Sequence, residues 1–302
     1  MIEKNKLIEK GIVMEKVPKS LYKYGNLDIA KEEKILSIEK GEIWLSYAKE
    51  LNDPFEGRNL YIDVQKMKDV RYTEKHIKAA YEIYSMMQEH MLIGSFANNS
   101  DDDNMLMWAH YANSHKGYCL KYKVVNDEFI YPIEYREKRI NGTILIDKIY
   151  RNHLEQMQQR KHIPWDKETK IQLLLNYLIK DIVWKYEKEF RVIKSFYQDN
   201  RDAMDKTLSE MIPYFLNDDT SSQRFNELQE EFDKICKGSP GKNYTENELG
   251  MELEEILIGY RCEYMDELIE VAKKRGVKVF RVEPTIHEEK YSLENIEITG
   301  SK

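Results

Sequence analysis

The pattern of hydrophobic and polar positions predicts a β-α-β unit at the start of the chain. Residues 20–25 and 41–48 are short aromatic-rich runs, which are typical of strands. Residues 28–41 between them show helical spacing and end at Gly41, a residue type that favours the end of a helix. The stretch LNDPFEGRN that follows contains Pro54, so we expect a structured loop there rather than a regular element.

The same spacing rules predict elements along the rest of the chain. The predicted strands lie at 91–97, 118–124, 129–135, 253–259, 277–284 and, as an edge strand, 295–300. The predicted helices lie at 63–91, as one helix or a helix pair, at 105–117 with Asp103 or Asn104 as its N-cap, and at 263–276 with Gly276 at its end. The last helix and its two flanking strands form a second β-α-β unit.

Two long helical blocks interrupt the strands. They lie at 144–182, with a break near Pro164, and at 202–250, with breaks at Pro213 and at the stretch NDDTSS. We therefore expect an α+β fold with a mixed or antiparallel β core, flanking helices and two helical insertions. The expected organisation is an N-terminal extension at 1–19, a single domain at 20–287 with its clearest soft joint at 237–243, and a C-terminal tail at 288–302.

The stretch WKYEKEFRVI at 184–193 fits two local structures. As a strand it has one mostly apolar and aromatic face and one face that carries the charged residues Lys185, Glu187, Glu189 and Arg191. As a helix it would separate Glu187 from Glu189 by about 200° around the axis. We favour a helix through about Asp181 and a strand from Trp184, because aromatic and β-branched residues dominate after that point. On the strand, both carboxylates face the same way.

Composition and charge narrow the function classes. The formal net charge of -7 gives no positive field over the whole chain, so non-specific nucleic-acid binding is disfavoured. Cys119, Cys236 and Cys262 are far apart and predict neither a disulfide framework nor a zinc site. No run approaches the roughly 18 apolar residues of a membrane span. We expect a cytoplasmic protein.

The carboxylates of Glu187 and Glu189 are the first candidate for chemistry. Strand residues two positions apart lie about 7 Å from each other, which lets two carboxylates interact and still take separate roles. One would stabilise a developing cation while the other orients a group or accepts a proton. The alternative is a solvated strand face on which Lys185 and Arg191 pair with these acids.

The stretch MLMWAHYANSHKG at 105–117 is the second candidate. Trp108 and Tyr111 share a helix face, and His110 and His115 offer groups suited to acid-base work or ligand binding. A purely structural role for the histidines is the alternative. The spacing of the two histidines does not match the HExxH pattern, so no metal is expected.

The loop NDPFE at 52–56 is the third candidate. Asn52 and Asp53 either fix the loop through side-chain hydrogen bonds or bind a ligand. The chain contains no glycine-rich phosphate loop, GxSxG elbow or cysteine-histidine nucleophile pattern. The common nucleotide-binding and hydrolase templates are therefore disfavoured.

Taken in order, these motifs resemble the bacterial family catalogued as domain of unknown function 2971. The resemblance covers about residues 20–285 and rests on LYKY at 21–24, IWLS at 43–46, LNDPFEG at 51–57, SF at 95–96, MWAHYANSHKG at 107–117, WKYEKEFR at 184–191 and EEILIG at 254–259. The name of that family implies no activity.

The layout is also similar to that of NAD-dependent ADP-ribosyltransferases. There, a first-strand His or Arg holds the ribose of the cofactor, a second motif supplies Ser or Tyr, and a late Glu stabilises the ribosyl cation after nicotinamide leaves. The resemblance implies Glu189 as the catalytic acid and Glu187 as the neighbour that orients the acceptor. Lys23 replaces the usual His or Arg, and Ser46 or Ser95 supplies the second motif. The implied NAD-binding residues are Lys23, Tyr24, Ser46, Asn52, Asp53, Ser95, Trp108, Tyr111, His115 and Arg191, with His110 as a further catalytic candidate.

The expected function is therefore that of an ADP-ribosyltransferase-like enzyme with a protein, nucleic-acid or small-molecule acceptor. A second hypothesis is a metal-dependent nuclease in which Asp53, Glu187 and Glu189 hold Mg²⁺ beside Lys194. A third is a non-catalytic sensing or interaction module of a phage-defence system.

Overall fold

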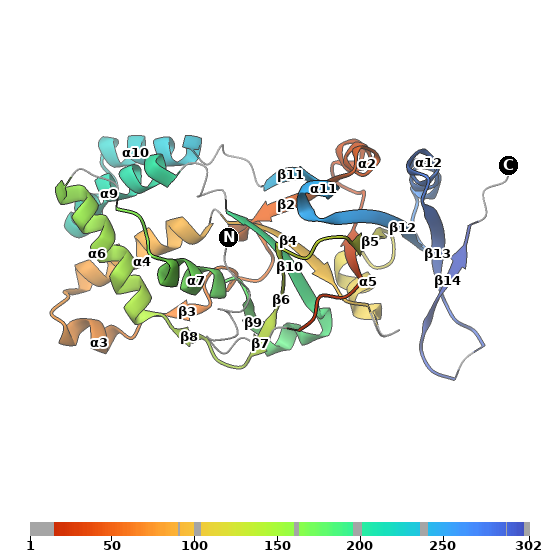
Figure 1. Cartoon of the computed structure of the whole chain (residues 1–302), viewed down its shortest axis with the longest axis horizontal. Helices are drawn as coiled ribbons and strands as arrows, with labels where there is room; N and C mark the ends of the chain where they lie inside the picture. Colours follow the sequence, from red (N-terminus) through yellow and green to blue (C-terminus); the bar gives the residue numbers. More distant parts are fainter. Residues whose placement is uncertain are drawn as a thin grey trace.

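A ten-stranded mixed sheet runs through the part of the chain that the structure describes (Figure 1). This computed structural model describes residues 15–89, 91–99, 104–159, 163–195, 201–235, 241–287 and 289–298. The strands of the sheet are β1 (Ser20–Gly25), β2 (Glu42–Tyr47), β4 (Met91–Ala97), β5 (Tyr118–Val124), β6 (Ile130–Pro132), β10 (Glu189–Ser195), β11 (Gly241–Thr245), β12 (Met251–Gly259), β13 (Lys278–Pro284) and β14 (Leu293–Glu297). Their order is β11-β2-β4-β1-β5-β12-β13-β14, with β10 beside β4 and β6 beside β10. The expected α+β class with a mixed, mostly antiparallel core is confirmed.

Strand β4 creates a gap in this sheet. One edge of β4 pairs with β10 along its whole length. The other edge pairs with β2 at Ile93 and Leu92 and with β1 only at Ala97. Residues 94–96 therefore lie opposite a gap between β1 and β2, which we call the fork.

Helices α2 (Lys31–Lys40) and α12 (Met265–Arg275) pack against each other beside the sheet. Each ends at a glycine with positive φ, Gly41 at 70° and Gly276 at 65°, because glycine adopts the left-handed conformation of a helix cap without steric cost. Both predicted helix ends are confirmed. The β12-α12-β13 unit is also confirmed, since β12 and β13 pair in parallel.

A layer of helices occupies the opposite end of the molecule (Figure 1). It consists of α3 (Val64–Asp69), α4 (Glu74–Glu89), α6 (Thr143–Gln159), α9 (Arg201–Asn217) and α10 (Gln223–Ile235). The predicted break at Pro213 is wrong, because α9 continues through this residue. Met211 and Ile212 are fully buried beside it, and their burial offsets the lost hydrogen bond.

The remaining elements are short. They are β3 (Leu60–Tyr61) parallel to β8 (Ile140–Asn141), β7 (Glu134–Arg136) parallel to β9 (Ile179–Asp181), the 3₁₀ helices η1 (Ala48–Glu50) and η2 (Ile182–Glu187), and the helices α5 (Met105–Tyr111), α7 (Lys167–Leu175) and α11 (Glu246–Leu249). None of the helices in the described ranges is long and apolar enough to cross a membrane.

Several predicted strands and helices agree with the structure and others need correction. The strands expected at 20–25, 91–97 and 118–124 are present with the same bounds. The strand expected at 129–135 is divided into β6 and β7, because β6 pairs with β10 in the large sheet whereas β7 leaves that sheet and pairs with β9. The range 202–250 also contains β11, which pairs with β2.

Two further corrections concern helix lengths. The block at 144–182 is helical only to Leu175 and then forms β9, and the helix expected at 105–117 ends at Tyr111. After that residue, Asn113, Ser114 and His115 all have positive φ, which is incompatible with a right-handed helix. Residues 1–14, 100–103 and 237–240, on which parts of the predicted extension, loop and joint fall, lie outside the described residues.

The most consequential correction concerns WKYEKEFRVI. The strand expected from Trp184 begins only at Glu189, and residues 182–187 form the 3₁₀ helix η2. Lys188 ends η2 with a positive φ of 45°. The chain turns there, so Glu187 and Glu189 come from different elements rather than from one strand face.

Candidate functional site

A cavity of about 290 Å³ lies at the fork between β1 and β2. Its lining includes residues from β1, β2, β4 and β10, from α5, and from the loop that contains NDPFE. The sequence-predicted residues that line it are Lys23, Tyr24, Ser46, Asn52, Ser95, Tyr111, Glu187 and Glu189. Side chains from six separate stretches of sequence thus converge on one small space.

Both glutamates of the stretch WKYEKEFRVI, Glu187 and Glu189, bind the same lysine. Lys180 Nζ of β9 donates to Glu187 Oε2 at 2.6 Å and to Glu189 Oε2 at 3.2 Å. All three side chains are about 95% buried. The lysine therefore links two carboxylates that the turn at Lys188 brings to the same cavity.

Arg191 does not line the cavity itself but binds two carboxylates that do, those of Glu189 and Glu56. Its Nε donates to Glu189 Oε1 at 2.7 Å, and its terminal nitrogens contact both Glu189 and Glu56. A fifth N–H donates to the Tyr177 carbonyl oxygen at 2.8 Å. The guanidinium has five N–H donors, and the contacts of the fully buried Arg191 account for each of them.

The environments of Glu187 and Glu189 shift the pKa values of these two carboxyl groups in opposite directions. Burial raises the pKa of Glu189, but the charges of Arg191 and Lys180 outweigh it and hold this pKa at about 2. Burial also raises the pKa of Glu187, and there the opposing attraction of Lys180 is weaker than the burial effect. Glu189 is therefore a fixed anion at neutral pH, whereas Glu187 accepts a proton more readily than an ordinary glutamate.

The hydroxyl group of Tyr111 and the amide of Asn52 complete this side of the cavity. The Tyr111 hydroxyl donates a hydrogen bond to Glu187 Oε1 and accepts one from Asn52 Nδ2 at 3.3 Å. His110, on the neighbouring face of α5, binds the Tyr186 hydroxyl through Nδ1 at 2.9 Å. Asn52 is thus tied to the carboxylate pair through Tyr111, while His110 contacts Tyr186 of η2 instead of lining the cavity.

Strand β1 contributes a lysine and an aromatic wall. Lys23 Nζ lies 5.0 Å above the centre of the Phe96 ring and donates to the Ser95 carbonyl oxygen at 3.4 Å. Burial lowers the pKa of Lys23 to about 8. Tyr24 lies next to it, and its hydroxyl accepts a hydrogen bond from Asn99 at 2.5 Å.

Five of the predicted residues do not line the cavity, namely Arg191, described above, and Trp108, His115, Asp53 and His110. Trp108 is 1% exposed. Its ring lies edge-on to that of Tyr24 and is stacked on that of His115, with ring centroids 6.0 Å apart. The carboxylate of Asp53 accepts a hydrogen bond from the Phe55 backbone N–H at 2.9 Å, which fixes the loop. Trp108, His115 and Asp53 therefore act in packing and loop structure, and His110 lies beside the cavity.

Sequence reasoning missed two residues of the buried ion network. Glu56 lies in the motif LNDPFEG, where Asn52 and Asp53 give the local turn signal and a single glutamate gives none. Lys180 was assigned to a helix, where nothing in its spacing connects it to the later glutamates. The one available signal was that three acids among apolar neighbours need buried cations as partners.

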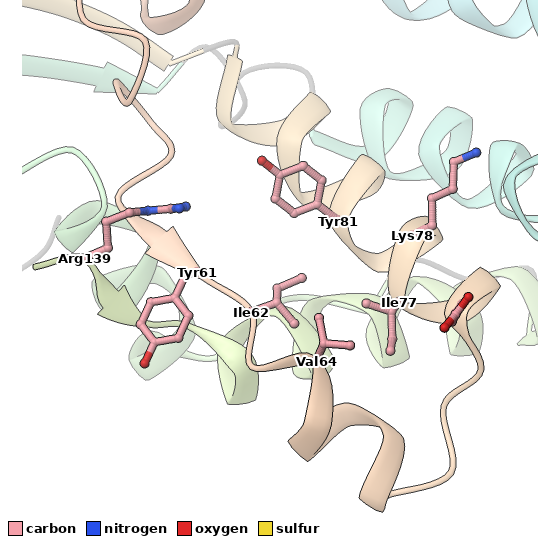
Figure 2. A pocket seen from close by; sticks show the side chains of 8 residues that line it. Tyr61, Ile62, Val64, Ile77, Lys78, Tyr81 and Arg139 are labelled. Carbon is pink, nitrogen blue, oxygen red and sulfur yellow. The ribbon is translucent and has the colours of Figure 1, made fainter.

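A second and larger hollow lies between β3, α3 and α4 (Figure 2). It measures about 490 Å³, and Tyr61, Ile77, Tyr81 and Arg139 are among its lining residues. Two of its charged lining residues are in ion pairs, Lys78 with Asp218 at 3.4 Å and Glu74 with Lys68 at 2.9 Å, and Arg139 donates to the Leu60 carbonyl oxygen. None of the sequence-predicted site residues lies there, so the fork cavity is the stronger candidate.

The geometry does not support a Mg²⁺ site made by Asp53, Glu187 and Glu189. Among the residues that the structure describes, no group of three or more His, Cys, Asp or Glu side chains could hold a metal ion. Lys194, which was expected beside the metal, lies over the Phe129 ring and donates to the Glu248 carbonyl oxygen.

Comparison with known proteins gives one match. No curated protein and no solved structure matches the chain. One family model matches residues 107–192. This region contains α5 from Met107 onward, β9, η2 and most of β10, and hence Tyr111, Lys180, Glu187 and Glu189 of the cavity. Over residues 107–192, the chain matches the model of a family described as "Protein of unknown function (DUF2971)".

Proposed function

We propose that the protein is an ADP-ribosyltransferase-like enzyme that uses NAD as a substrate and reacts in the fork cavity. The observation that carries this proposal is the pair Glu187 and Glu189, which share a cavity and a lysine but have pKa values shifted in opposite directions. Two carboxyl groups whose environments move their pKa values apart can take different roles in one reaction.

Glu189 has the properties required to stabilise a cation. Cleavage of the glycosidic bond between nicotinamide and ribose breaks a C–N bond, and the bonding electrons leave with the neutral nicotinamide. The ribosyl carbon then becomes positive. A carboxylate that stays ionised and is fixed by Arg191 can stabilise that charge without reorganising.

Glu187 has the properties required of a base. When an acceptor hydroxyl or amine forms its bond to the ribosyl carbon, it must lose a proton. A carboxylate whose pKa is raised toward neutrality accepts that proton more effectively than an ordinary glutamate. The contacts of Glu187 with Tyr111 and Lys180 keep it oriented.

The size and lining of the cavity are compatible with one end of NAD. A volume of about 290 Å³ is at the lower end of the range of small-molecule sites, so the cavity suits a nicotinamide-ribose group rather than the whole molecule. Tyr22, Tyr24, Phe96 and Tyr111 supply aromatic surface for a planar ring.

The test is to incubate the protein with NAD labelled in nicotinamide, with and without protein, nucleic-acid and small-molecule acceptors, and to measure nicotinamide release. We expect Glu189→Gln to slow release by roughly 10²-fold or more, because a neutral amide cannot stabilise the cation. Glu187→Gln should slow transfer to an acceptor by a similar factor. Glu227→Gln, on the exposed face of α10, is the matched control and should have no effect.

Thermal unfolding of each variant separates a catalytic effect from a folding defect. Absence of both NAD binding in calorimetry and nicotinamide release by the wild-type protein would overturn the proposal. Binding without turnover would support the alternative, a non-catalytic sensing module, of which a role in phage defence is one case.

A further inference from the structure

The two lysines of the fork cavity have very different partners. Lys180 binds Glu187 and Glu189 and lies 3.7 Å from Glu56, so three carboxylates surround it. Lys23 makes no ion pair within the described part of the chain; its hydrogen bond is the long one to the Ser95 carbonyl oxygen. An ammonium group has three donors, so most of the hydrogen-bonding capacity of Lys23 is unused.

The fork explains why Lys23 is held in this position. Because β4 pairs with neither β1 nor β2 at Ser95, the carbonyl oxygen of this residue is open to a side chain from β1. The aromatic face of Phe96 attracts the ammonium from the same strand. These contacts hold a desolvated positive charge in the cavity wall without neutralising it.

The nearest acidic neighbour of Lys23 is already occupied. Glu189 acts on Lys23 electrostatically, but both of its oxygens accept hydrogen bonds from Arg191 and one also from Lys180. A partly buried cation that lacks a hydrogen-bonded counter-ion costs free energy, and an anionic ligand lowers that cost.

A hydroxyl on the facing strand offers a second donor. Ser46 of β2 lines the same cavity, and its oxygen accepts a hydrogen bond from Trp44 Nε1 at 3.1 Å. Because the oxygen is occupied as an acceptor, the hydroxyl hydrogen remains available to a ligand. Lys23 and Ser46 thus offer donors from the two sides of the fork.

We propose that Lys23 and Ser46 form an anion subsite that takes a phosphate group of the ligand at the fork. The choice of phosphate over carboxylate rests on the proposed function, because NAD carries a pyrophosphate. The subsite would hold a phosphate next to the carboxylate pair and so fix the end of the ligand that enters the cavity.

The test is calorimetric binding of inorganic pyrophosphate at pH 7 to the wild-type protein and to three variants. Lys23→Met should weaken binding at least tenfold and Ser46→Ala by a smaller factor. Lys194→Met is the matched control, because Lys194 also lies over a phenylalanine ring and donates to a backbone carbonyl but is outside the cavity. Its affinity should equal that of the wild type.

Methionine keeps the apolar stem that packs on Phe96, and unfolding temperatures check that Lys23→Met is folded. No pyrophosphate binding by the wild type, or equal binding by Lys23→Met, would overturn the anion subsite. Tighter binding of malonate than of pyrophosphate would overturn its assignment to phosphate.

The result is distinguishable from that for the enzymatic proposal. Lys23-dependent pyrophosphate binding without nicotinamide release would support the subsite and reject the proposed reaction. Nicotinamide release with an unchanged KM for NAD in Lys23→Met would support the reaction and reject the subsite.

Discussion

Replacing Arg191 with methionine tests whether the buried ion network needs every one of its charges. The wild-type guanidinium is 0% exposed and donates to Glu56, Glu189 and the Tyr177 carbonyl oxygen. In Arg191→Met, the two carboxylates keep only Lys180, which lies 3.7 Å from Glu56 and 3.2 Å from Glu189. The variant therefore carries buried negative charge with too few partners.

Removal of one partner from a buried ion pair costs about 3–5 kcal/mol of unfolding free energy. At roughly 2 °C per kcal/mol for a chain of this size, Tm should fall by roughly 6–10 °C at pH 7. The difference in unfolding free energy between Arg191→Met and the wild type should be smaller at pH 5. In the variant, Glu56 and Glu189 can then take up protons and lose the charge that Arg191 balances in the wild type. Guanidinium-induced unfolding at both pH values measures these differences.

The exposed Arg224 is the control for this substitution. It pairs with Glu227 at 3.2 Å on the surface of α10, where ion pairs contribute little, so Arg224→Met should leave stability nearly unchanged at both pH values. If Arg191→Met lowers the unfolding free energy by less than about 1 kcal/mol at pH 7, or by more at pH 5 than at pH 7, the reasoning is refuted.

Three further predictions concern acid stability, ligand affinity and packing. The depressed pKa of Glu189, about 2 against an ordinary 4.5, contributes stability above about pH 4.5 that is lost as the pH falls toward 2; unfolding free energies measured across this range should fall for the wild type and be flatter in Glu189→Gln. ADP-ribose affinity in calorimetry should decline as the pH rises through about 8, where Lys23 loses its charge, since the bridging phosphates of ADP-ribose do not titrate there, burial raises the pKa of Tyr22 and Tyr24 away from this range and Glu189 stays ionised; an affinity that is constant from pH 7 to 9.5 contradicts this. Gly117→Ala should lower the unfolding free energy by about 1–3 kcal/mol in denaturant titrations, because its Cβ would meet the backbone carbonyl oxygen of Gly25, and an unchanged midpoint would show that the strands can move apart.

Much of the strand pattern could be predicted from the sequence because each strand has a local signal. Strand β1 is rich in aromatic residues, β4 is a mostly apolar run, and glycine ends α2 and α12. Such signals depend on a few neighbouring residues. They do not report which strands pair, and the fork depends on the pairing of β4 with three partners.

The start of β10 illustrates where local signals fail. Trp184 and Tyr186 have high strand propensity, yet they lie in the 3₁₀ helix η2, where Trp184 packs over Lys180 and Tyr186 binds His110. Tertiary contacts outweigh propensity at these positions. The two glutamates still meet, but they do so through the turn at Lys188 and the shared Lys180 rather than through strand alternation.

The candidate site was predictable for residues that stand out by their chemistry and not for their partners. Glu187, Glu189 and Tyr111 attract attention as acids and aromatics in a short motif. Glu56 and Lys180 are recognisable only once their neighbours in space are known, because each contacts residues distant in sequence or in a different element.

The most direct test of the central claim is a crystal structure of the protein with ADP-ribose. The ligand should occupy the fork cavity, with its ribose in contact with Glu189 and a phosphate within hydrogen-bonding distance of Lys23 Nζ. ADP-ribose in the hollow of Figure 2, or at any other position with only water in the fork cavity, would contradict the account.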